Sequence, residues 1–313
     1  MSAKMRFITA MLIFSTIALV VKNVEYSASV IVLARCVIGA LFLMGFFVVT
    51  RRSPDWKAIK ENGRWLLLSG IGLGLNWLFL FEAFKHTTVS VSILCYYLAP
   101  VIALLSAPIF LKETITRQQV LCILVALLGM FFVSGAYSGE IVGVTGIVFA
   151  LLAALFYASV IVINRKIKNI SPYDVSMIQL LCAAIIFVFY VPMTQDLSAI
   201  TWSNEAALLL LIAGVVHTGI AYLLYFSSFS SLSTQSISVL SYLDPVMSMV
   251  FAWLILNEPL TTSSMIGGAL ILGATFAMEF CGKKWKNSWL SNTAVQDNLW
   301  YEDLKRIKNI IDF

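Results

Sequence analysis

Ten apolar segments follow one another along this chain, and they limit its fold more than any other feature of the sequence. A helix of about 20 apolar residues crosses the hydrocarbon core of a bilayer. Here 60% of the residues are hydrophobic and only 12% are charged, whereas a soluble domain carries roughly 25% charged residues. One water-soluble core cannot bury so much apolar surface, so we predict an all-α membrane protein with ten transmembrane helices. Their expected ranges are 5–22, 29–50, 66–84, 89–111, 118–134, 141–163, 174–192, 206–227, 234–256 and 263–281.

The lysines and arginines between these segments predict the orientation of the chain in the membrane. Cytoplasmic loops of membrane proteins collect basic residues. If the N-terminus lies inside, the inner loops hold 15 Lys and Arg residues and the outer loops hold only Lys22 and Lys85. We therefore expect a multi-pass protein of the cell (cytoplasmic) membrane with both termini in the cytoplasm. The inner residues are Lys4, Arg6, Arg51, Arg52, Lys57, Lys60, Arg64, Lys112, Arg117, Arg165, Lys166, Lys168, Lys283, Lys284 and Lys286.

An internal repeat adds a second constraint. The stretch Ile93–Thr116 recurs without a gap as Ser238–Thr261, which places Pro100 on Pro245 (245 − 100 = 145). Each half would contain five helices, and because five is odd, the second half enters the membrane upside down. Inverted repeats of this kind recur in secondary transporters, whose substrate site lies near the midplane. The expected units are a five-helix repeat at 1–137, an inverted repeat at 138–281, and a cytoplasmic tail at 282–313 that is either an amphipathic helix or unstructured.

Two motifs carry a resemblance to a known family. They are LFEAFKHTTVSVSILCYYLAPVIALLSAPIFLKETIT, around the fourth segment, and YLDPVMSMVFAWLILNEPLT, in the ninth. Each combines a proline inside the helix with a glutamate at its far end: Pro100 with Glu113, and Pro245 with Glu258. Over residues 5–281 the chain resembles the EamA-type transporters of the drug/metabolite transporter superfamily. This resemblance implies ten helices in an inverted repeat, and the export or exchange of small metabolites, amino acids or drugs.

Prolines and a carboxylate inside the apolar segments are the first candidate site residues. Pro100 and Pro245 each remove a backbone hydrogen bond at mid-span, so they are either hinges or static kinks. Asp244 lies at a depth where a carboxylate is costly, and its symmetry partner is Ala99. We expect Asp244 either to take up a proton or bind a substrate ammonium group, or to join helices by hydrogen bonding. Ser241 lies on the same helix face.

Arg35 and the glutamates near helix ends form a second group of candidates. The planar guanidinium of Arg35 suits a carboxylate, either of a substrate or of Glu82; alternatively, its side chain extends to the outer interface. Glu82 lies near the outer end of the third segment, where it either pairs locally or contributes to a gate. For Glu113 and Glu258 we expect capping or loop pairing near the start of the following helix rather than contact with substrate.

Polar and aromatic residues at mid-depth complete the candidates. His217 is either a hydrogen-bonded structural residue or a group that titrates near neutral pH. Thr218, Tyr222, Tyr225 and Phe229 recur on one helix face; such a stripe is more often packing, but it could contribute to an aromatic cage for an organic cation or a flat ligand. Asn76 and Gln179 most simply make hydrogen bonds between helices. The other members of such a cage would be Trp77, Tyr96, Tyr97 and Tyr242.

Motifs of other function classes are missing from the sequence. The five cysteines form no CxxC pair and no zinc-type cluster with histidine. The net charge of +5 is spread over segment ends rather than collected on a soluble basic face. The sequence shows no phosphate-binding loop and no nucleophile–base pattern. We therefore expect that the chain binds no metal, cofactor or nucleic acid and that it is not an enzyme.

The leading hypothesis is a secondary transporter that exports small metabolites, such as amino acids, by alternating access, with proton coupling left open. The first alternative is a multidrug or organic-cation exporter, favoured by the tyrosines and Asp244. The alternatives from other classes are a channel, which would conduct without saturation, and a sensor that does not transport. The expected partners are a small-molecule substrate, the lipid bilayer and, in the coupled case, protons; the sequence does not indicate an oligomeric state.

Overall fold

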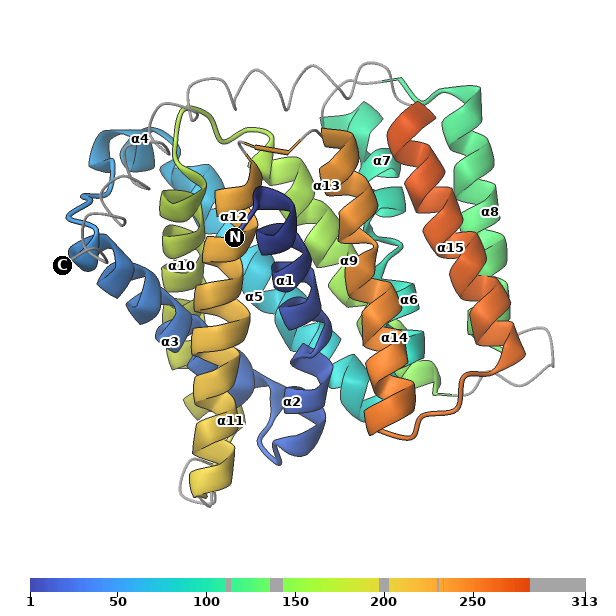
Figure 1. Ribbon diagram of the computed structural model, residues 1–313, viewed down its shortest axis with the longest axis horizontal. Coiled ribbons are helices and arrows are strands. Elements are labelled where there is room, and N and C mark those ends of the chain that lie inside the picture. The colour runs from blue at the N-terminus through green and yellow to red at the C-terminus, as the bar shows by residue number, and fades with distance from the viewer. Residues whose placement is uncertain (111–113, 136–142, 197–202, 230, 233, 282–313) are drawn as a thin grey trace.

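The computed structural model of the chain describes residues 1–110, 114–135, 143–196, 203–229, 231–232 and 234–281. Within these ranges every regular element is helical, and no strand occurs. This confirms the all-α expectation for the described residues. Many of the long helices run between the top and the bottom of the view in Figure 1. The expected tail at 282–313 lies outside the described residues.

The helices follow the order of the expected segments. The first series comprises α1 (Ala3–Ser15), α2 (Ile17–Asn23), α3 (Ala28–Val49), α4 (Trp56–Glu61), α5 (Gly63–His86), α6 (Val89–Tyr96), α7 (Ala99–Phe110) and α8 (Arg117–Val133). The second series comprises α9 (Val144–Asn164), α10 (Pro172–Thr194), α11 (Asn204–Gly214), the π-helix η3 (Val215–Ile220), α12 (Ala221–Phe229), α13 (Thr234–Ser241), α14 (Leu243–Ile255) and α15 (Thr262–Cys281).

Apolar helices occur in each of the ten expected ranges, but only some are long enough to span a membrane. Seven helical stretches meet the length and composition of a membrane span. They are Ala3–Asn23, Ala28–Val49, Gly63–His86, Val89–Phe110, Val144–Asn164, Pro172–Thr194 and Asn204–Ser228. Three shorter apolar helices, Arg117–Val133, Val239–Ile255 and Thr262–Met278, occupy the remaining ranges.

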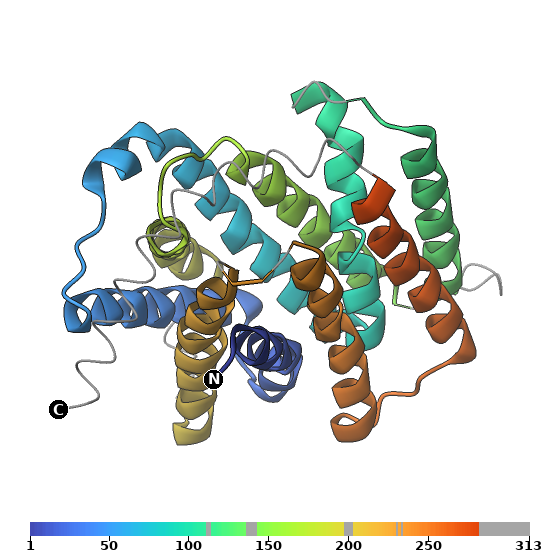
Figure 2. The same ribbon diagram turned by 45° about the horizontal axis from the view of Figure 1, so that its top comes forward.

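Helices α8 and α15, the last helices of the first and second series, stand side by side at one edge of the molecule (Figures 1 and 2). They meet at two glycines. A Cβ atom added to Gly129 would lie 2.7 Å from the carbonyl oxygen of Gly267, and one added to Gly267 would lie 2.6 Å from the carbonyl oxygen of Gly129. Small residues allow such close backbone contact between membrane helices. This contact therefore joins the first and second series at that edge.

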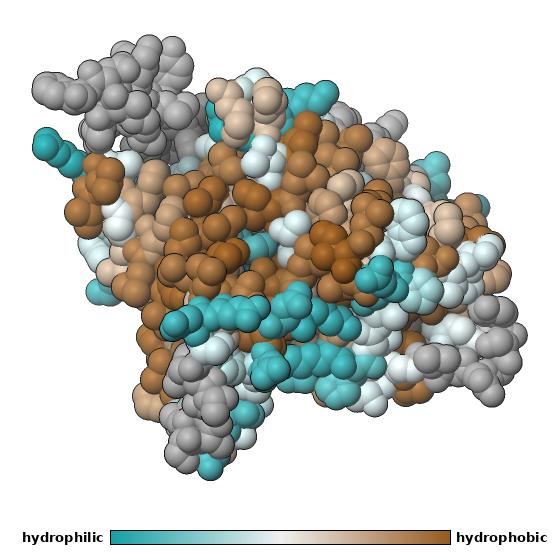
Figure 3. All heavy atoms as spheres, turned by 60° about the horizontal axis from the view of Figure 1, so that its bottom comes forward, coloured by the Kyte–Doolittle hydropathy of each residue, from teal (hydrophilic) through white to brown (hydrophobic). Residues whose placement is uncertain are grey.

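Charged side chains gather at two opposite ends of the helices. The first, here called the Lys22 end, holds Lys22, Lys85 and Glu258. The second, here called the Arg52 end, holds Arg52, whose Nη2 lies 3.7 Å from Oδ2 of Asp174. Figure 3 shows a hydrophilic band where the Lys22 end comes forward, next to broad hydrophobic surfaces. Polar ends with apolar flanks between them are the arrangement that a bilayer requires.

Candidate functional site

Four expected segments are interrupted. The first is broken at Thr16, between α1 and α2, and the eighth contains η3 in place of α-helix. The fourth is broken at Tyr97–Leu98, and the ninth at Tyr242. In a membrane, irregular backbone is tolerated only where protein buries it or where it lines a water-filled cavity. Transporters often form their substrate site at such interruptions.

Two of these interruptions have a cause in the sequence. Pro100 and Pro245 lack an N–H group, so the carbonyl oxygens of Tyr96 and Ser241, four residues earlier, lose their helical donors. Helix α6 ends at Tyr96 and α13 at Ser241. Each proline then lies in the first turn of the next helix, where its missing N–H is tolerated. The hinge role expected for the two prolines stays a prediction.

Arg35 of α3 lies deep among the helices, with 5% of its surface exposed. Its Nε donates a hydrogen bond of 2.8 Å to Oγ1 of Thr218 in η3. Its guanidinium carbon lies 3.7 Å from the centroid of the Trp77 ring and 5.8 Å from that of Phe81. The head group is therefore held by hydrogen bonding and cation–π attraction within the protein, and it does not extend to the interface.

The terminal nitrogens of Arg35 have no acceptor among the described residues. A guanidinium carries five N–H donors, and Thr218 takes only the one on Nε. No carboxylate oxygen of the described chain pairs with Arg35, and Glu82 is no exception. Neither Nη atom of Arg35 is one of the fully buried side-chain nitrogens that lack a hydrogen-bond partner. Arg35 thus keeps N–H donors on its two Nη atoms that no acceptor of the described residues takes.

Asp244, in the first turn of α14, is a second unpaired charge. Its Oδ2 accepts a hydrogen bond of 3.0 Å from the hydroxyl group of Tyr97. This bond joins the interruption in the fourth segment to the one in the ninth. Asp244 remains partly accessible, and no lysine, arginine or histidine nitrogen in the described ranges pairs with it.

Tyrosine rings lie around both charges. Tyr96 stacks on Tyr157 of α9, with a distance of 5.2 Å between ring centroids. Tyr96 also lies edge-on to Tyr97, with 5.9 Å between the ring centroids, and Tyr97 is the residue that donates a hydrogen bond to Asp244. We call this group of residues the central cluster: Arg35, Trp77, Tyr96, Tyr97, Tyr157, His217, Thr218, Tyr222 and Asp244.

His217 connects η3 to the first segment. It is buried, and its Nε2 lies 3.0 Å from Oγ1 of Thr16, at the interruption between α1 and α2. Its Nδ1 lies 3.3 Å from the carbonyl oxygen of Ile212. Both ring nitrogens therefore have protein partners, as expected for a structural histidine.

Asn76 and Gln179 make contacts between helices. The Nδ2 of Asn76 donates a hydrogen bond of 2.8 Å to the carbonyl oxygen of Ala153, which joins α5 to α9. The Nε2 of Gln179 donates to Oγ of Ser69 at 2.5 Å and to Oδ1 of Asn164 at 2.9 Å. These bonds link α10 to α5 and α9, so they serve packing.

The three remaining candidates make local or peripheral contacts. The carboxylate of Glu82 lies 3.8 Å from Nδ1 of His86, one turn later. Ser241 donates a hydrogen bond to a carbonyl oxygen of its own helix. Tyr242 packs against Phe276 of α15, with ring centroids 5.4 Å apart. The symmetry-related tyrosines of the repeat thus have different surroundings.

One member of the central cluster, Tyr157, was not among the candidates chosen from the sequence. Thr218 was expected only as one position of the stripe that contains Tyr222, and not as a partner of Arg35. Tyr157 lies in an apolar segment with no polar pattern, so the sequence did not single it out. The π-helix that contains Thr218 was also not predicted, although such elements often occur at functional sites.

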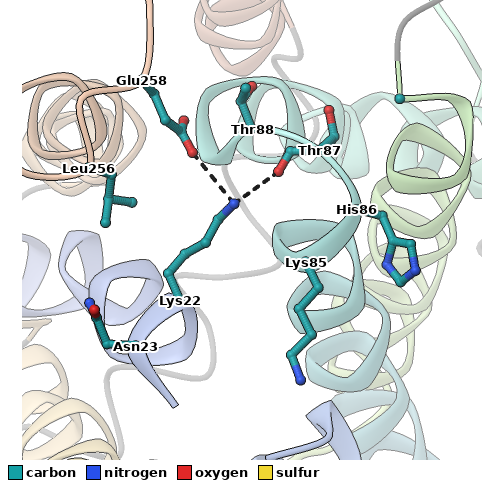
Figure 4. Close-up of a pocket in the computed structure, with 9 residues that line it drawn as sticks. Lys22, Asn23, Lys85, His86, Thr87, Thr88, Leu256 and Glu258 are labelled. Carbon is teal, nitrogen blue, oxygen red and sulfur yellow. Dashed lines mark hydrogen bonds and ion pairs between the residues drawn. The ribbon is translucent and has the colours of Figure 1, made fainter. Parts of the chain in front are cut away.

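A surface hollow of about 630 Å³ at the Lys22 end is crossed by one ionic contact (Figure 4). The Nζ of Lys22 lies 3.7 Å from Oε1 of Glu258 and donates a hydrogen bond of 3.2 Å to the carbonyl oxygen of Thr87. Lys85, which lines the same hollow, donates to the carbonyl oxygen of Tyr26. These contacts hold α2, α5 and the residues after α14 together at this end.

Glu258 also binds the start of α6. Its carboxylate accepts hydrogen bonds from the backbone N–H groups of Val89 at 2.9 Å and Ser90 at 3.4 Å. A negative charge at a helix N-terminus is stabilising, because the first N–H groups have no partner in the helix. The prediction that Glu258 caps the helix that follows it in the sequence is therefore wrong. Glu258 caps α6, which belongs to the other half of the chain. Glu113 lies outside the described residues.

The two ends of the repeated segments are packed differently. Near the Lys22 end, α6 packs against α14. Their counterparts nearer the Arg52 end, α7 and α13, have no comparable contact in the described ranges. Six of the eight α6 residues are buried, whereas the side chains of α13 that the structure describes are half-buried or exposed. The repeated segments are therefore packed together more closely at the Lys22 end than nearer the Arg52 end.

The described residues contain no group of three or more His, Cys, Asp or Glu side chains that could hold a metal ion. Cys36, Cys95, Cys122 and Cys182 are free thiols. The chemistry available in the central cluster is therefore that of charge, hydrogen bonding and aromatic contact.

The family model of the EamA-like transporter family matches the chain twice, over residues 2–135 and 144–280. The chain belongs to the EamA-like transporter family. This confirms the resemblance found in the two repeated motifs. As a member of this family, the chain is a multi-pass membrane protein whose relatives are named as transporters.

Individual relatives and a solved structure agree with this assignment. The chain is 32% identical over 255 residues to the uncharacterized transporter YxxF of Bacillus subtilis (strain 168), covering 80% of each chain. It is 22% identical over 222 residues to Protein PecM of Dickeya dadantii (strain 3937), covering 69% of this chain and 73% of that one. A crystal structure at 20% sequence identity superimposes with a TM-score of 0.62, over 90% of this chain and 99% of the other. That likeness supports the fold.

Proposed function

We propose that this EamA-like protein is a secondary transporter that exports small metabolites by alternating access. The observation that carries the proposal is the central cluster, which places two unpaired charges and several tyrosines at interruptions of membrane helices. Charged groups inside membrane segments are costly and mark transport pathways. The proposed architecture has ten membrane helices in two inverted halves, residues 1–137 and 138–281.

We assign the Lys22 end to the outer face of the cell membrane and the Arg52 end to the cytoplasm. The excess of Lys and Arg in the loops at the Arg52 end supports this orientation, which also places both termini in the cytoplasm. The central cluster is then shielded from the outside by the contact between α6 and α14 and by Glu258. This is the arrangement that an exporter needs in order to load its substrate from the cytoplasm.

After the substrate binds from the cytoplasm, the Lys22 end would open and the Arg52 end would close. The contact between α6 and α14 would open while α7 and α13 close, because the two interrupted segments carry the same motif in opposite orientations. Pro100 and Pro245 are the expected hinges. Asp244 would take up a proton in the coupled form of the mechanism.

A multidrug exporter of organic cations is the second candidate. It is favoured by Asp244 together with the tyrosine rings of the cluster, because carboxylates and aromatic faces attract cations. Arg35 disfavours it, since its positive charge lies in the same cluster.

Flux into and out of proteoliposomes tests the proposed function. Purified protein is reconstituted, and counterflow of amino acids and of organic cations is measured with and without a pH gradient. A secondary transporter gives saturable flux and exchange, and a proton-coupled one loses its response to the gradient in Asp244→Asn. Flux that rises linearly with concentration would indicate a channel instead, and no flux of any solute would contradict the proposal.

A further inference from the structure

We propose that a basic surface at the Arg52 end binds the headgroups of anionic phospholipids. We call this surface the basic platform; it is formed by α4, the residues on either side of α4, and the turn between α9 and α10. Figure 1 shows α4 at the upper left of the molecule. The inference goes beyond the proposed function, because it concerns the lipid around the protein and not the solute. The exposed basic residues of the platform are Arg51, Lys57, Lys60, Arg64, Lys166 and Lys168.

The tertiary structure joins two distant segments of the chain into this platform. Asn62, which follows α4, is buried. Its Nδ2 donates a hydrogen bond of 3.0 Å to the carbonyl oxygen of Lys168, and its Oδ1 accepts one of 3.1 Å from the N–H of the same residue. Lys166 and Lys168 are therefore held in one unit with α4. Side chains of both segments also form a single buried apolar cluster, which contains Ala58, Leu66, Ile167 and Ile170.

The positive charges of the platform have no counter-charge among the residues that the structure describes. None of the six side chains forms an ion pair with a carboxylate of the described chain. The exposed acidic residues of the same segments are Asp55 and Glu61, and Asp55 already accepts a hydrogen bond of 3.0 Å from the N–H of Ala58. Six exposed basic residues against two exposed acidic ones leave an excess of four positive charges, which attracts an anionic partner.

The neighbours of the platform place it at the level of lipid headgroups. Helix α3 ends at Val49 and α5 begins at Gly63, and both are long and apolar enough to span a membrane. Trp56, at the start of α4, is 65% exposed, and tryptophans gather where the hydrocarbon of a bilayer meets its headgroups. A lipid satisfies the apolar and the basic surface together, whereas a soluble acidic partner satisfies only the basic one. The exposed apolar residues that flank the platform are Val48, Val49, Leu67 and Leu68.

Arg64 combines both properties in one side chain. It is exposed, and its guanidinium carbon lies 4.4 Å from the centroid of the Trp65 ring. The ring attracts the cation and limits its orientations. The planar head of an arginine matches two oxygens of a phosphate group. The start of α5 therefore suits a phosphate group whose acyl chains lie along the exposed Leu67 and Leu68.

The test compares two lipids that differ in headgroup charge. The full chain in a neutral detergent is titrated with anionic dioctanoyl-phosphatidylglycerol and with zwitterionic dioctanoyl-phosphatidylcholine, and affinity is measured by calorimetry. We expect the anionic lipid to bind at least about tenfold more tightly, because each basic residue near an anionic surface contributes about a fivefold factor. The preference should fall toward equal affinity in about 1 M salt, which screens exposed charges.

Two pairs of lysines test whether the distant segments act as one surface. Lys57→Gln/Lys60→Gln should lose most of the preference for the anionic lipid. Lys166→Gln/Lys168→Gln should lose a similar share, although these lysines lie about a hundred residues later in the chain, and it serves alone if the first variant does not fold. Lys57→Arg/Lys60→Arg, which keeps both charges, should retain the preference.

A control variant removes the same charge elsewhere. Lys4→Gln/Arg117→Gln changes two exposed basic residues in the first turns of α1 and α8, outside the platform, and should keep the preference. Equal affinity of the wild type for both lipids, or an equal loss in this control, would overturn the inference. Inorganic phosphate that binds as tightly as the anionic lipid would also contradict it, since the site would then take a soluble anion. No solute flux enters these measurements, so their outcome is separate from that of the proposed function.

Discussion

The two copies of the repeated segment share a motif but differ in their packing. Both copies place a helix interruption just before a proline, between α6 and α7 and between α13 and α14. Yet α6 is largely buried and capped by Glu258, whereas the described part of α13 is half-buried or exposed. Two copies of one motif can therefore adopt two environments in one molecule. Exchange of these environments is the physical basis that alternating access requires.

The largest expected effect comes from moving the carboxylate to the other copy. Ala99, the symmetry partner of Asp244, is fully buried. Ala99→Asp should destabilise the protein by about 2.5–3.5 kcal/mol, the cost of a charge at the centre of a membrane helix. Thermal unfolding in detergent measures this change, with Ala99→Asn as the control for added volume. Equal stability of Ala99→Asp and wild type would show that the two positions are alike.

The glycines at the α8–α15 contact offer a second comparison. Gly129→Ala should destabilise the protein by about 1–3 kcal/mol, because the added methyl group meets the backbone of Gly267. Gly273, in α15, has no atom within 4 Å of an added Cβ. Gly273→Ala should therefore stabilise the helix by about 0.5–1 kcal/mol. If the unfolding midpoints of both variants shift in the same direction, the close contact between α8 and α15 at Gly129 is contradicted.

Removing the charge of Glu258 should make the protection of α6 at the Lys22 end more like that of α13 nearer the Arg52 end. Glu258→Gln weakens the cap on α6 and the pairing with Lys22, at a cost of about 1 kcal/mol. Amide hydrogen exchange of residues 87–96 should then rise about fivefold, toward the rate of residues 234–241. Glu25→Gln is the control, since that side chain is exposed. Unchanged protection of α6 would mean that Glu258 does not hold this end closed.

The smallest effect is expected at the bond that joins the two interruptions. Tyr97→Phe removes the hydrogen bond to Asp244 at a cost of about 1 kcal/mol. The half-saturating substrate concentration in counterflow should change about fivefold. Tyr190→Phe, on an exposed position of α10, should leave it unchanged. If both variants behave like the wild type, the Tyr97–Asp244 bond has no part in the transport cycle.

Much of the architecture was predictable from hydropathy and repetition. The ten expected ranges all contain apolar helix, because long apolar runs without charges are stable only as helices in a bilayer. A local change of the helix at Pro100 and Pro245 was also predictable, since each proline removes a backbone hydrogen bond, although α7 and α10 continue past Pro108 and Pro192. The interruption at Thr16 and the π-helix η3 were not, because no proline marks them and packing decides them.

The candidate site was only partly predictable. Depth along a segment identified Asp244, Arg35 and Tyr96 as unusual, because the cost of a polar or charged group in a membrane rises with its depth. Depth does not say which helix faces meet. Glu82 was therefore one expected partner of Arg35, and Tyr157 was not considered.

The sequence by itself determined the class of fold, the helical segments and the family. These follow from local composition and from a repeat whose two copies align without a gap. Only the tertiary structure decided that Arg35 lies on Trp77 and bonds to Thr218, and that Glu258 caps a helix 168 residues earlier in the chain. The physical reason is that a helix can turn about its axis without changing its hydropathy. Side-chain partners are settled only when all the helices pack together.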